Sequence, residues 1–292
     1  MNLAGVYVPL ITRFDEAGHV DKKANQEFIE VMLANGVTGV VVGGTTGEGY
    51  ALTHDERHHV LATAIKQVNG RVPVMAGVGG VSTNEALDHA AIARRLDADG
   101  LMIAAPAYVL PTPSELATHV EAILKATGLE AVLYDYPART GVSFTTEVLD
   151  ILAPHDQVIG IKEASGDLSR IDLIQERNYN SFEVVCGNDS DSRVFFDKGV
   201  TSWIGGIANA LPKAHEGIMN PATRDEAFAA VIPLLSYIEE GQYNAKVKAL
   251  AGILGLPSDF IRGPLKPASA EQVAKLRELV EIAGDWAPVL AG

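Results

Sequence analysis

Short apolar runs alternate with amphipathic stretches along most of the chain. Apolar runs of a few residues that are bounded by turn residues are typical of buried strands, whereas apolar residues spaced three and four apart are typical of helices. On this pattern the sequence predicts eight strands, at residues 5–10, 37–42, 72–76, 100–103, 131–134, 158–162, 182–186 and 201–204. It predicts helices between them at residues 22–35, 54–68, 83–96, 113–127, 145–152, 168–177 and 191–198.

The alternation of strands and helices indicates βα units and a parallel sheet. Eight such units are typical of a (β/α)8 barrel. A doubly wound sheet is the alternative, and it would place a Gly-rich phosphate-binding turn after the first strand. Pro9-Leu10-Ile11-Thr12 follows that strand instead. We therefore expect an α/β fold, a (β/α)8 TIM barrel with a C-terminal helical extension.

The pattern changes to helix alone in the last part of the chain. Helices are expected at residues 224–239, 244–254 and 269–284, and the Pro- and Gly-rich segment 255–267 between them is expected to be irregular. The sequence thus predicts two domains, a barrel catalytic domain at residues 1–222 and a C-terminal helical domain at residues 223–292.

Composition and charge narrow the class of protein. The 292 residues carry a formal net charge of −14, which repels nucleic acid, and the Lys and Arg residues form no basic patch. Cys186 is the single cysteine, so an intrachain disulfide and a thiolate metal site are both excluded. No apolar run is long enough to cross a membrane, and the N-terminus does not resemble a signal peptide. We expect a cytoplasmic protein that binds neither nucleic acid nor membrane.

Lys162 closes the apolar run Val158-Ile159-Gly160-Ile161, at the expected mouth of the sixth strand. An ammonium that is partly stripped of water has a lowered pKa, because burial disfavours the charged form. A lysine that is neutral part of the time can condense with a ketone as a Schiff base. For a lone lysine in this setting the alternative is a side chain that reaches out to solvent.

Other candidate groups fall at the carboxyl ends of strands, where barrel chemistry is found. The hydroxyls of Thr45, Tyr108 and Tyr134 are candidate proton carriers for a 2-oxo acid bound to Lys162. The Gly-rich turn 43–49 exposes backbone N–H groups at Thr45 and Thr46 that suit a carboxylate. Further candidates for substrate binding are Arg139, whose guanidinium suits a second carboxylate, and Gly187 and Ile204 at the ends of strands seven and eight.

Each of these residues has a plainer alternative. Read alone, the turn 43–49 is a tight βα turn, Tyr134 a core aromatic residue and Arg139 a surface arginine. The turn lacks the Gly-Lys-Ser/Thr ending of a nucleotide-binding loop, so phosphate binding is disfavoured. His54, Asp55 and His58 share one stretch of helix, but no further ligand converges on them, so we expect no metal site.

Taken together, these residues resemble the dihydrodipicolinate synthase / N-acetylneuraminate lyase family of class I aldolases, and most closely its synthase branch. The resemblance spans nearly the whole chain. The motifs that carry it are Gly43-Gly44-Thr45-Thr46-Gly47-Glu48, Leu133-Tyr134-Asp135-Tyr136-Pro137-Ala138-Arg139-Thr140-Gly141, Gly160-Ile161-Lys162-Glu163-Ala164 and Arg262-Gly263-Pro264-Leu265-Lys266-Pro267.

The resemblance implies a role for several of these residues. It implies Lys162 as the Schiff-base residue and Tyr134 as the proton carrier to it, with Thr45 and Tyr108 completing the proton relay. In the synthases the residue at Tyr108 is supplied across a dimer interface, so a homotetramer built of dimers is implied. Thr46 would bind the pyruvyl carboxylate, and no metal or organic cofactor would be needed. Arg139 resembles the arginine that receives aspartate semialdehyde in the synthases.

The chain also departs from the family pattern. Asp135 stands where the family usually has Asn, Ala107 where many synthases have a second tyrosine, and Gly205-Gly206-Ile207 where serine and valine are more common. Lysine-sensitive synthases bind their inhibitor with polar residues at the positions of Val81 and Ala107, although His54 and Glu85 of that site remain. We therefore expect weak or absent inhibition by lysine.

Three functions remain open on the sequence. The first is 4-hydroxy-tetrahydrodipicolinate synthase activity, the condensation of pyruvate with aspartate semialdehyde, which Arg139 favours. The second is a catabolic relative, either a 2-keto-3-deoxy sugar-acid aldolase or dehydratase or a pyrroline-4-hydroxy-2-carboxylate deaminase, which would begin with the same imine. The third, of another class, is a non-catalytic sensor of a 2-oxo acid.

Overall fold

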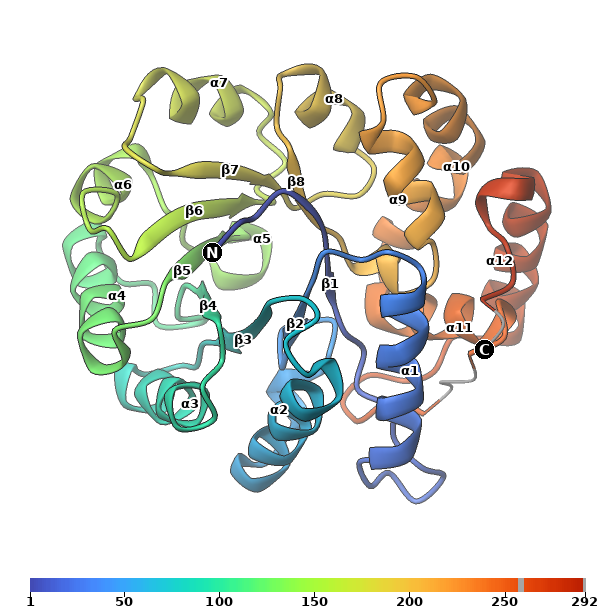
Figure 1. Ribbon diagram of the computed structural model, residues 1–292, viewed down its shortest axis with the longest axis horizontal. Helices are drawn as coiled ribbons and strands as arrows, with labels where there is room; N and C mark the ends of the chain where they lie inside the picture. The colour runs from blue at the N-terminus through green and yellow to red at the C-terminus, as the bar shows by residue number, and fades with distance from the viewer. Residues whose placement is uncertain (257–259, 291–292) are drawn as a thin grey trace.

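Eight parallel strands close into a barrel in the computed structural model, which describes residues 1–256 and 260–290 (Figure 1). Each strand pairs with the next along the chain, and β1 closes the ring against β8. The (β/α)8 prediction is confirmed, and every strand lies within two residues of its predicted bounds. The strands are β1 (Gly5–Pro9), β2 (Gly39–Val42), β3 (Val74–Val78), β4 (Gly100–Ala104), β5 (Ala131–Asp135), β6 (Val158–Glu163), β7 (Glu183–Cys186) and β8 (Ser202–Ile204).

Helices surround the barrel where the amphipathic stretches predict them. Thr53 starts one of them with a capping box, since its side chain accepts from the Glu56 N–H while Glu56 accepts from the Thr53 N–H. These helices are α1 (Lys22–Ala34), α2 (His54–Val68), α3 (Thr83–Arg95), α4 (Pro113–Thr127), α6 (Thr146–Leu152), α7 (Ser169–Glu176) and α8 (Ser192–Asp197).

Two further helices were not predicted. The four-residue α5 (Pro137–Thr140) is too short to show a helical period. In α9 (Pro212–Met219) the pattern is interrupted by Gly217, a residue with low helix propensity. A Cβ at Gly217 would lie 2.1 Å from Cζ3 of Trp286, so this glycine lets the indole pack against the helix. Helix α9 packs against β1 and completes the ring of barrel helices.

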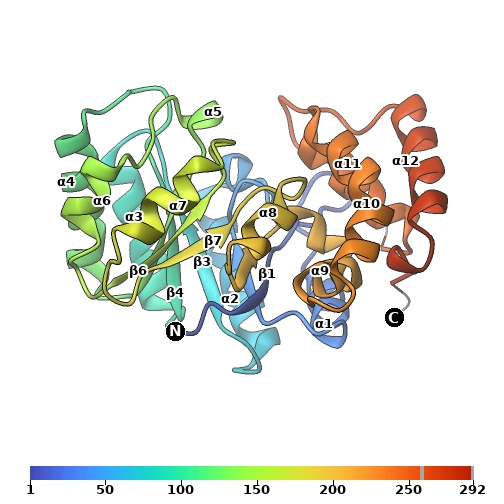
Figure 2. The same ribbon diagram turned by 90° about the horizontal axis from the view of Figure 1, so that it is seen from above.

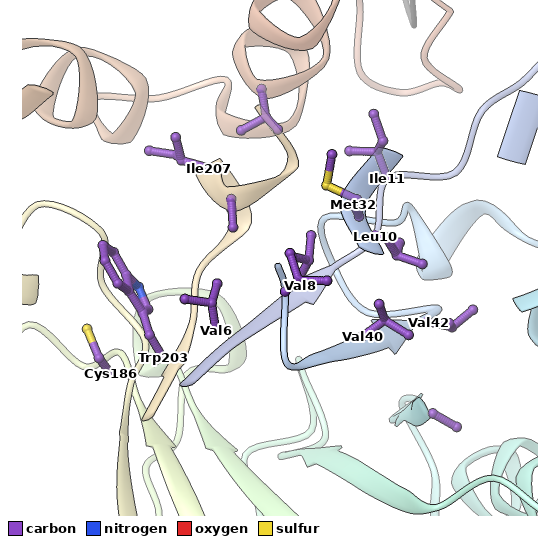
Figure 3. Close-up of a cluster of buried hydrophobic side chains, with 14 of the residues drawn as sticks. Val6, Val8, Leu10, Ile11, Met32, Val40, Val42, Cys186, Trp203 and Ile207 are labelled. Carbon is purple, nitrogen blue, oxygen red and sulfur yellow. The ribbon is translucent and has the colours of Figure 1, made fainter. Parts of the chain in front are cut away.

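Alternation along the strands sorts apolar side chains into two layers. One layer fills the barrel interior and includes Tyr7, Val41, Met102, Tyr134 and Ile204. The other lies between the strands and the helices, and Figure 3 shows part of it, including Val6 and Val8 of β1, Val40 and Val42 of β2, and Trp203 of β8. Because the interior is filled by side chains, a ligand has room only at an end of the barrel.

Three C-terminal helices stand beside the barrel, next to α9 (Figures 1 and 2). They are α10 (Arg224–Glu239), α11 (Tyr243–Ile253) and α12 (Ala270–Ala283), each within one residue of its predicted bounds. The segment predicted to be irregular forms neither helix nor strand at residues 255–256 and 260–267, and its residues 257–259 lie outside the described part. The predicted domain boundary after residue 222 falls between α9 and α10, and the division into two domains stays a prediction.

Short 3-10 helices complete the described chain. They are η1 (Gly49–Ala51), η2 (Gly206–Asn209) and η3 (Gly284–Trp286). The first follows β2 after the turn 43–48 and the second follows β8 after Gly205, so both lie on the side of the strands' carboxyl ends, where the candidate site lies.

Candidate active site

Lys162 lies near the carboxyl end of β6, level with Tyr134 on β5 and Val185 on β7. Since Tyr134 and Val185 belong to the interior layer, the lysine also points into the barrel, and only 5% of it is exposed. Burial lowers the pKa of Lys162 from 10.5 to about 8, against the attraction of Asp189. Within the described residues its Nζ makes no hydrogen bond, so the amine is available for reaction.

The phenol ring of Tyr134 packs against this amine. The Lys162 Nζ lies 4.2 Å from the centroid of the Tyr134 ring. Burial raises the pKa of Tyr134 well above its usual value, so the phenol keeps its proton at neutral pH. The described residues provide no hydrogen-bond partner for its hydroxyl. The phenol is therefore free to exchange a proton with a group bound at Lys162.

The carbonyl groups of the turn after β2 accept hydrogen bonds from side chains that lie outside the turn. The Thr12 hydroxyl donates to the Gly47 carbonyl at 2.6 Å. Side chains from two helices donate to three other carbonyls of the turn. Arg57 of α2 donates to Gly43 at 3.1 Å and to Gly49 at 2.6 Å, and Asn244 of α11 donates to Thr45 at 2.8 Å.

The backbone N–H groups of this turn, by contrast, are open at Thr45 and Thr46. Neither N–H has an acceptor among the described residues, although Thr46 is only 7% exposed. Gly49 makes the compact turn possible, because a Cβ there would lie 2.0 Å from the Gly43 carbonyl oxygen. Buried N–H groups without acceptors suit an anionic ligand such as a carboxylate.

Arg139 lies on α5, directly after β5. Its guanidinium is 5.2 Å from the centroid of the Tyr136 ring, and it forms no ion pair with any described residue. The positive charge of Arg139 lowers the pKa of both Lys162 and Tyr134, which places it within electrostatic reach of the two. Arg139 is exposed, and a guanidinium without an ion-pair partner among the described residues is suited to a second carboxylate.

The remaining predicted residues lie in different surroundings. Gly187 follows β7 and donates its N–H to the Glu163 carbonyl at 3.0 Å, while Ile204 is fully buried in the interior layer. Tyr108 stands apart from the group, since it is 88% exposed on the loop after β4 and has a φ of 76°. A tyrosine so placed has no access to the buried Lys162 of its own chain, and its role stays a prediction.

Two residues of this region were not among the candidates. Asp189 is buried after β7 and accepts a hydrogen bond from the Tyr243 hydroxyl of α11 at 2.6 Å. Its negative charge raises the pKa of Lys162 and so opposes the effect of burial. A Cβ at Gly206 would lie 2.3 Å from the Tyr243 hydroxyl, so the paired glycines after β8 were the one sequence signal for a large side chain at that place.

The departure at Asp135 is also explained. Asp135 follows Tyr134 on β5 and therefore points away from the barrel interior. Its Oδ2 accepts from Arg170 at 2.8 Å and from the Ser143 hydroxyl at 2.6 Å, and the same guanidinium donates to Glu163 at 2.7 Å. The carboxylate at this position thus belongs to an ion-pair network outside the candidate pocket.

In residues 1–256 and 260–290, no three His, Cys, Asp or Glu side chains gather where they could hold a metal ion. No helix among the same residues is long and apolar enough to cross a membrane.

A buried amine of lowered pKa beside a protonated phenol, at the carboxyl end of a barrel strand, is the arrangement of a class I aldolase. Comparison with known proteins agrees: a sequence model of the Dihydrodipicolinate synthetase family matches residues 2–283, and the chain belongs to that family. It is 34% identical over 285 residues to the 4-hydroxy-tetrahydrodipicolinate synthase of Geobacter metallireducens, covering 95% of this chain and 97% of that protein.

Solved structures give the same family. The dihydrodipicolinate synthase of Aquifex aeolicus has a TM-score of 0.92 and 30% identity, and the match covers 98% of this chain and 99% of that one. The chloride-inhibited dihydrodipicolinate synthase of Acinetobacter baumannii, solved in complex with pyruvate, also has a TM-score of 0.92, with 29% identity over 97% of this chain and 99% of that one.

Proposed function

We propose that this chain is a 4-hydroxy-tetrahydrodipicolinate synthase, which joins pyruvate to aspartate semialdehyde through an imine on Lys162. The observation that carries the proposal is the buried Lys162 amine, free of hydrogen bonds to described residues and packed against the Tyr134 ring. The relative from Geobacter metallireducens is a 4-hydroxy-tetrahydrodipicolinate synthase, which supports the choice of reaction, and the pyruvate in the Acinetobacter baumannii structure supports the choice of first substrate.

In the proposed first step the Lys162 Nζ attacks the keto carbon of pyruvate. The carbinolamine loses water to give the imine, and Tyr134 passes protons to and from the departing oxygen, with Thr45 and a partner's residue Tyr108 completing the relay. The Thr45 and Thr46 N–H groups hold the pyruvyl carboxylate, beside Gly187 and Ile204. Tyr134 accepts a methyl proton from the imine to give an enamine, whose carbon attacks the aldehyde carbon while the proton relay protonates the aldehyde oxygen. The amino group of the second substrate then attacks the imine carbon and displaces the Lys162 amine, which closes the ring and frees the enzyme. These steps need no metal or organic cofactor, and the proposal includes none.

Arg139 is the reason for preferring an acidic second substrate. Its guanidinium has no carboxylate partner in the described part of the chain, and it lies within electrostatic reach of Lys162. Aspartate semialdehyde offers the missing carboxylate. Replacing Arg139 with Ala is expected to weaken use of aspartate semialdehyde while pyruvate still binds to Lys162.

Borohydride trapping tests the imine. Incubation with pyruvate and borohydride is expected to add the mass of one reduced pyruvyl group, located at Lys162 by peptide mass spectrometry. Lys162→Ala should lose both the adduct and turnover, whereas Lys198→Met, at an exposed ion pair with Asp172, should keep both. A wild-type protein that forms no adduct would overturn the mechanism and favour a non-catalytic sensor.

A substrate panel tests the second half of the proposal. Pyruvate with aspartate semialdehyde is compared with 2-keto-3-deoxy sugar acids and with a pyrroline-4-hydroxy-2-carboxylate. Faster turnover of either rival substrate, with the same Lys162 adduct, would keep the imine chemistry and reassign the reaction to a catabolic relative.

The proposal includes a homotetramer built of dimers. Large apolar side chains are exposed near the site, among them Tyr108 at 88%, Leu110 at 59%, Val109 at 52% and Tyr50 at 51%. Exposed apolar groups in one region favour association with a partner. Sedimentation that showed an active monomer would contradict this part. We also place the reaction in the cytoplasm, where the free thiol of Cys186 would stay reduced, and cell fractionation tests that placement.

A further inference from the structure

Glu48 closes the turn that carries Thr45 and Thr46, and its placement is unusual. It has a left-handed backbone with φ of 54°, which is uncommon for a residue other than glycine, and its side chain is fully buried. A buried carboxylate next to a site for an anionic substrate works against that site unless its charge is compensated. The compensation comes from the far end of the chain.

Lys248 of α11 forms an ion pair with Glu48, and it is itself only 2% exposed. Its Nζ also donates to the Phe260 carbonyl at 2.8 Å, and the Arg262 backbone N–H donates to the second Glu48 carboxylate oxygen at 2.8 Å. Burial lowers the pKa of Lys248, while the charge and hydrogen bond of Glu48 raise it. The Glu48 carboxylate and the Lys248 ammonium therefore compensate each other, and their other hydrogen-bond partners, Phe260 and Arg262, are far from the turn in sequence.

Helix α11 also contacts the turn through a second residue. Asn244 lies four residues before Lys248, on the same face of the helix, and its amide donates to the Thr45 carbonyl at 2.8 Å. The two contacts hold both ends of the segment from Thr45 to Glu48. The Thr45 carbonyl and the Thr46 N–H belong to one planar peptide group, so the hydrogen bond from Asn244 fixes the direction of that open N–H. The Thr45 N–H shares a peptide group with the Gly44 carbonyl, which accepts from the Gly49 N–H at 3.0 Å within the turn.

A buried ion pair is weak evidence for stability, because the cost of desolvating two charges offsets much of their attraction. The better-attested role of such pairs is to fix one arrangement of the chain. Here the arrangement that is fixed is the anion-binding turn. We propose that Lys248 and Asn244 are positioning residues of the active site, through which α11 holds the Thr45–Thr46 N–H groups at the substrate carboxylate. The inference rests on the proposed carboxylate-binding function of that turn.

A positioning role for Lys248 and Asn244 predicts a specific change in the kinetics. Among the described residues, neither Lys162 nor Tyr134 forms a hydrogen bond or ion pair with Lys248 or Asn244, so loosening the turn should impair capture of the 2-oxo acid more than the later chemistry. A purely structural role predicts instead a lower melting temperature with an unchanged pyruvate requirement in the folded protein. The half-saturating pyruvate concentration therefore separates the two roles.

Lys248→Met removes the charge and retains an unbranched apolar side chain. We expect the pyruvate concentration for half-maximal borohydride trapping to rise by at least about tenfold, within the roughly hundredfold that a misplacement of about 1 Å can cause. At saturating pyruvate, kcat should fall by a smaller factor than KM rises. Lys198→Met, which breaks the exposed ion pair with Asp172, is the matched control and should change neither quantity.

The double variant Glu48→Gln/Lys248→Met removes both buried charges and keeps an oxygen for the Arg262 N–H. This variant separates position from charge, because no unpaired carboxylate is left while the link between α11 and the turn is still lost. The half-saturating pyruvate should therefore stay raised. A return to the wild-type value would show that the unpaired charge alone caused the loss and would overturn the positioning role of Lys248. If Lys248→Met is not recovered as folded protein, Asn244→Ala provides the test. It removes the hydrogen bond to the Thr45 carbonyl and a longer one to the Tyr50 hydroxyl at 3.4 Å, and it leaves the buried ion pair in place. An increase in half-saturating pyruvate is expected there too.

The outcomes are distinguishable from failure of the proposed function. A wild-type protein that pyruvate and borohydride do not label would remove the basis of the proposal. A wild-type protein that is labelled, with folded Lys248→Met and Asn244→Ala labelled at the same half-saturating pyruvate, would leave the function standing and overturn the positioning role.

Discussion

Tyr134 and Lys162 occupy the same level of the β5–β6 pair, with the lysine Nζ 4.2 Å from the centroid of the phenol ring. Burial favours the neutral amine, whereas the ring face and Asp189 favour the ammonium. These opposing effects leave the pKa of Lys162 at about 8 rather than at the far lower values of some buried lysines. An amine with such a pKa is partly uncharged near neutral pH and can still accept a proton during the reaction.

The rate of imine formation should follow the titration of this amine. At low pyruvate, the trapping rate is expected to rise with pH through a midpoint of about 8 and then to level off, because only the neutral amine attacks. Arg139 lowers the pKa of Lys162, so Arg139→Ala should move the midpoint upward. A midpoint close to 10.5 in the wild-type protein would show that Lys162 is not the buried amine described above.

The same burial should make Lys162 a source of instability. At pH 7 the amine is protonated in the folded and the unfolded states, so the folded state bears the full penalty of a buried charge. As the pH rises from about 8 to beyond 10.5, the folded state loses its proton first and the penalty disappears. Lys162→Met is therefore expected to gain about 3 kcal/mol at pH 7, at about 1.4 kcal/mol per unit of pKa, and to gain little above pH 10.5.

Urea unfolding of Lys162→Met and the wild-type protein at both pH values measures this difference. A variant that is less stable than the wild-type protein at pH 7 would mean that the amine contributes favourable contacts in the fold. The gain is also the expected sign for a residue retained for reactivity rather than for stability.

The barrel could be predicted because its information is local. Each strand is a short apolar run between turn residues, and each predicted barrel helix is an amphipathic stretch between two such runs. Helix α9 was missed because a proline and Gly217 obscure its period, and its packing against β1 depends on the closed barrel. Contacts between side chains of elements that are far apart in the sequence leave no such local pattern.

The candidate site likewise contains residues that the sequence predicts and contacts that it does not. Lys162, Tyr134 and the Thr45–Thr46 turn were placed by their position at strand ends, which a barrel brings to one face. Asn244 contacts Thr45 across 199 residues of sequence, and no periodicity indicates that contact. Asp189 lies two residues after the candidate Gly187, yet its hydrogen bond from Tyr243 depends on the position of α11.

Tyr108 should act on the proton relay rather than on pyruvate binding. Its side chain is 88% exposed in the single chain, so its proposed place is the site of a partner subunit. Tyr108→Phe keeps the ring and removes the hydroxyl. Turnover is expected to fall by about a hundredfold or more, in the range of a lost general acid–base group, with a smaller change in the pyruvate concentration for half-maximal trapping. Equal losses in both quantities would count against the relay role.

Inhibition by lysine is expected to be weak or absent. Val81, in the loop before α3, is 48% exposed, and Ala107, in the loop between β4 and α4, is exposed too. Neither has a polar side chain for the charged ends of lysine. Glu85 remains, but its carboxylate accepts the Val81 N–H at 2.8 Å and is thereby engaged in local structure. Initial rates with increasing lysine should stay near the uninhibited value.

Val81→Asn/Ala107→Tyr, which introduces polar groups at both positions, should increase sensitivity to lysine, since the ammonium and carboxylate groups of lysine then find hydrogen-bond partners. Strong inhibition of the wild-type enzyme, or a double variant as insensitive as the wild type, would show that these two positions do not control the response.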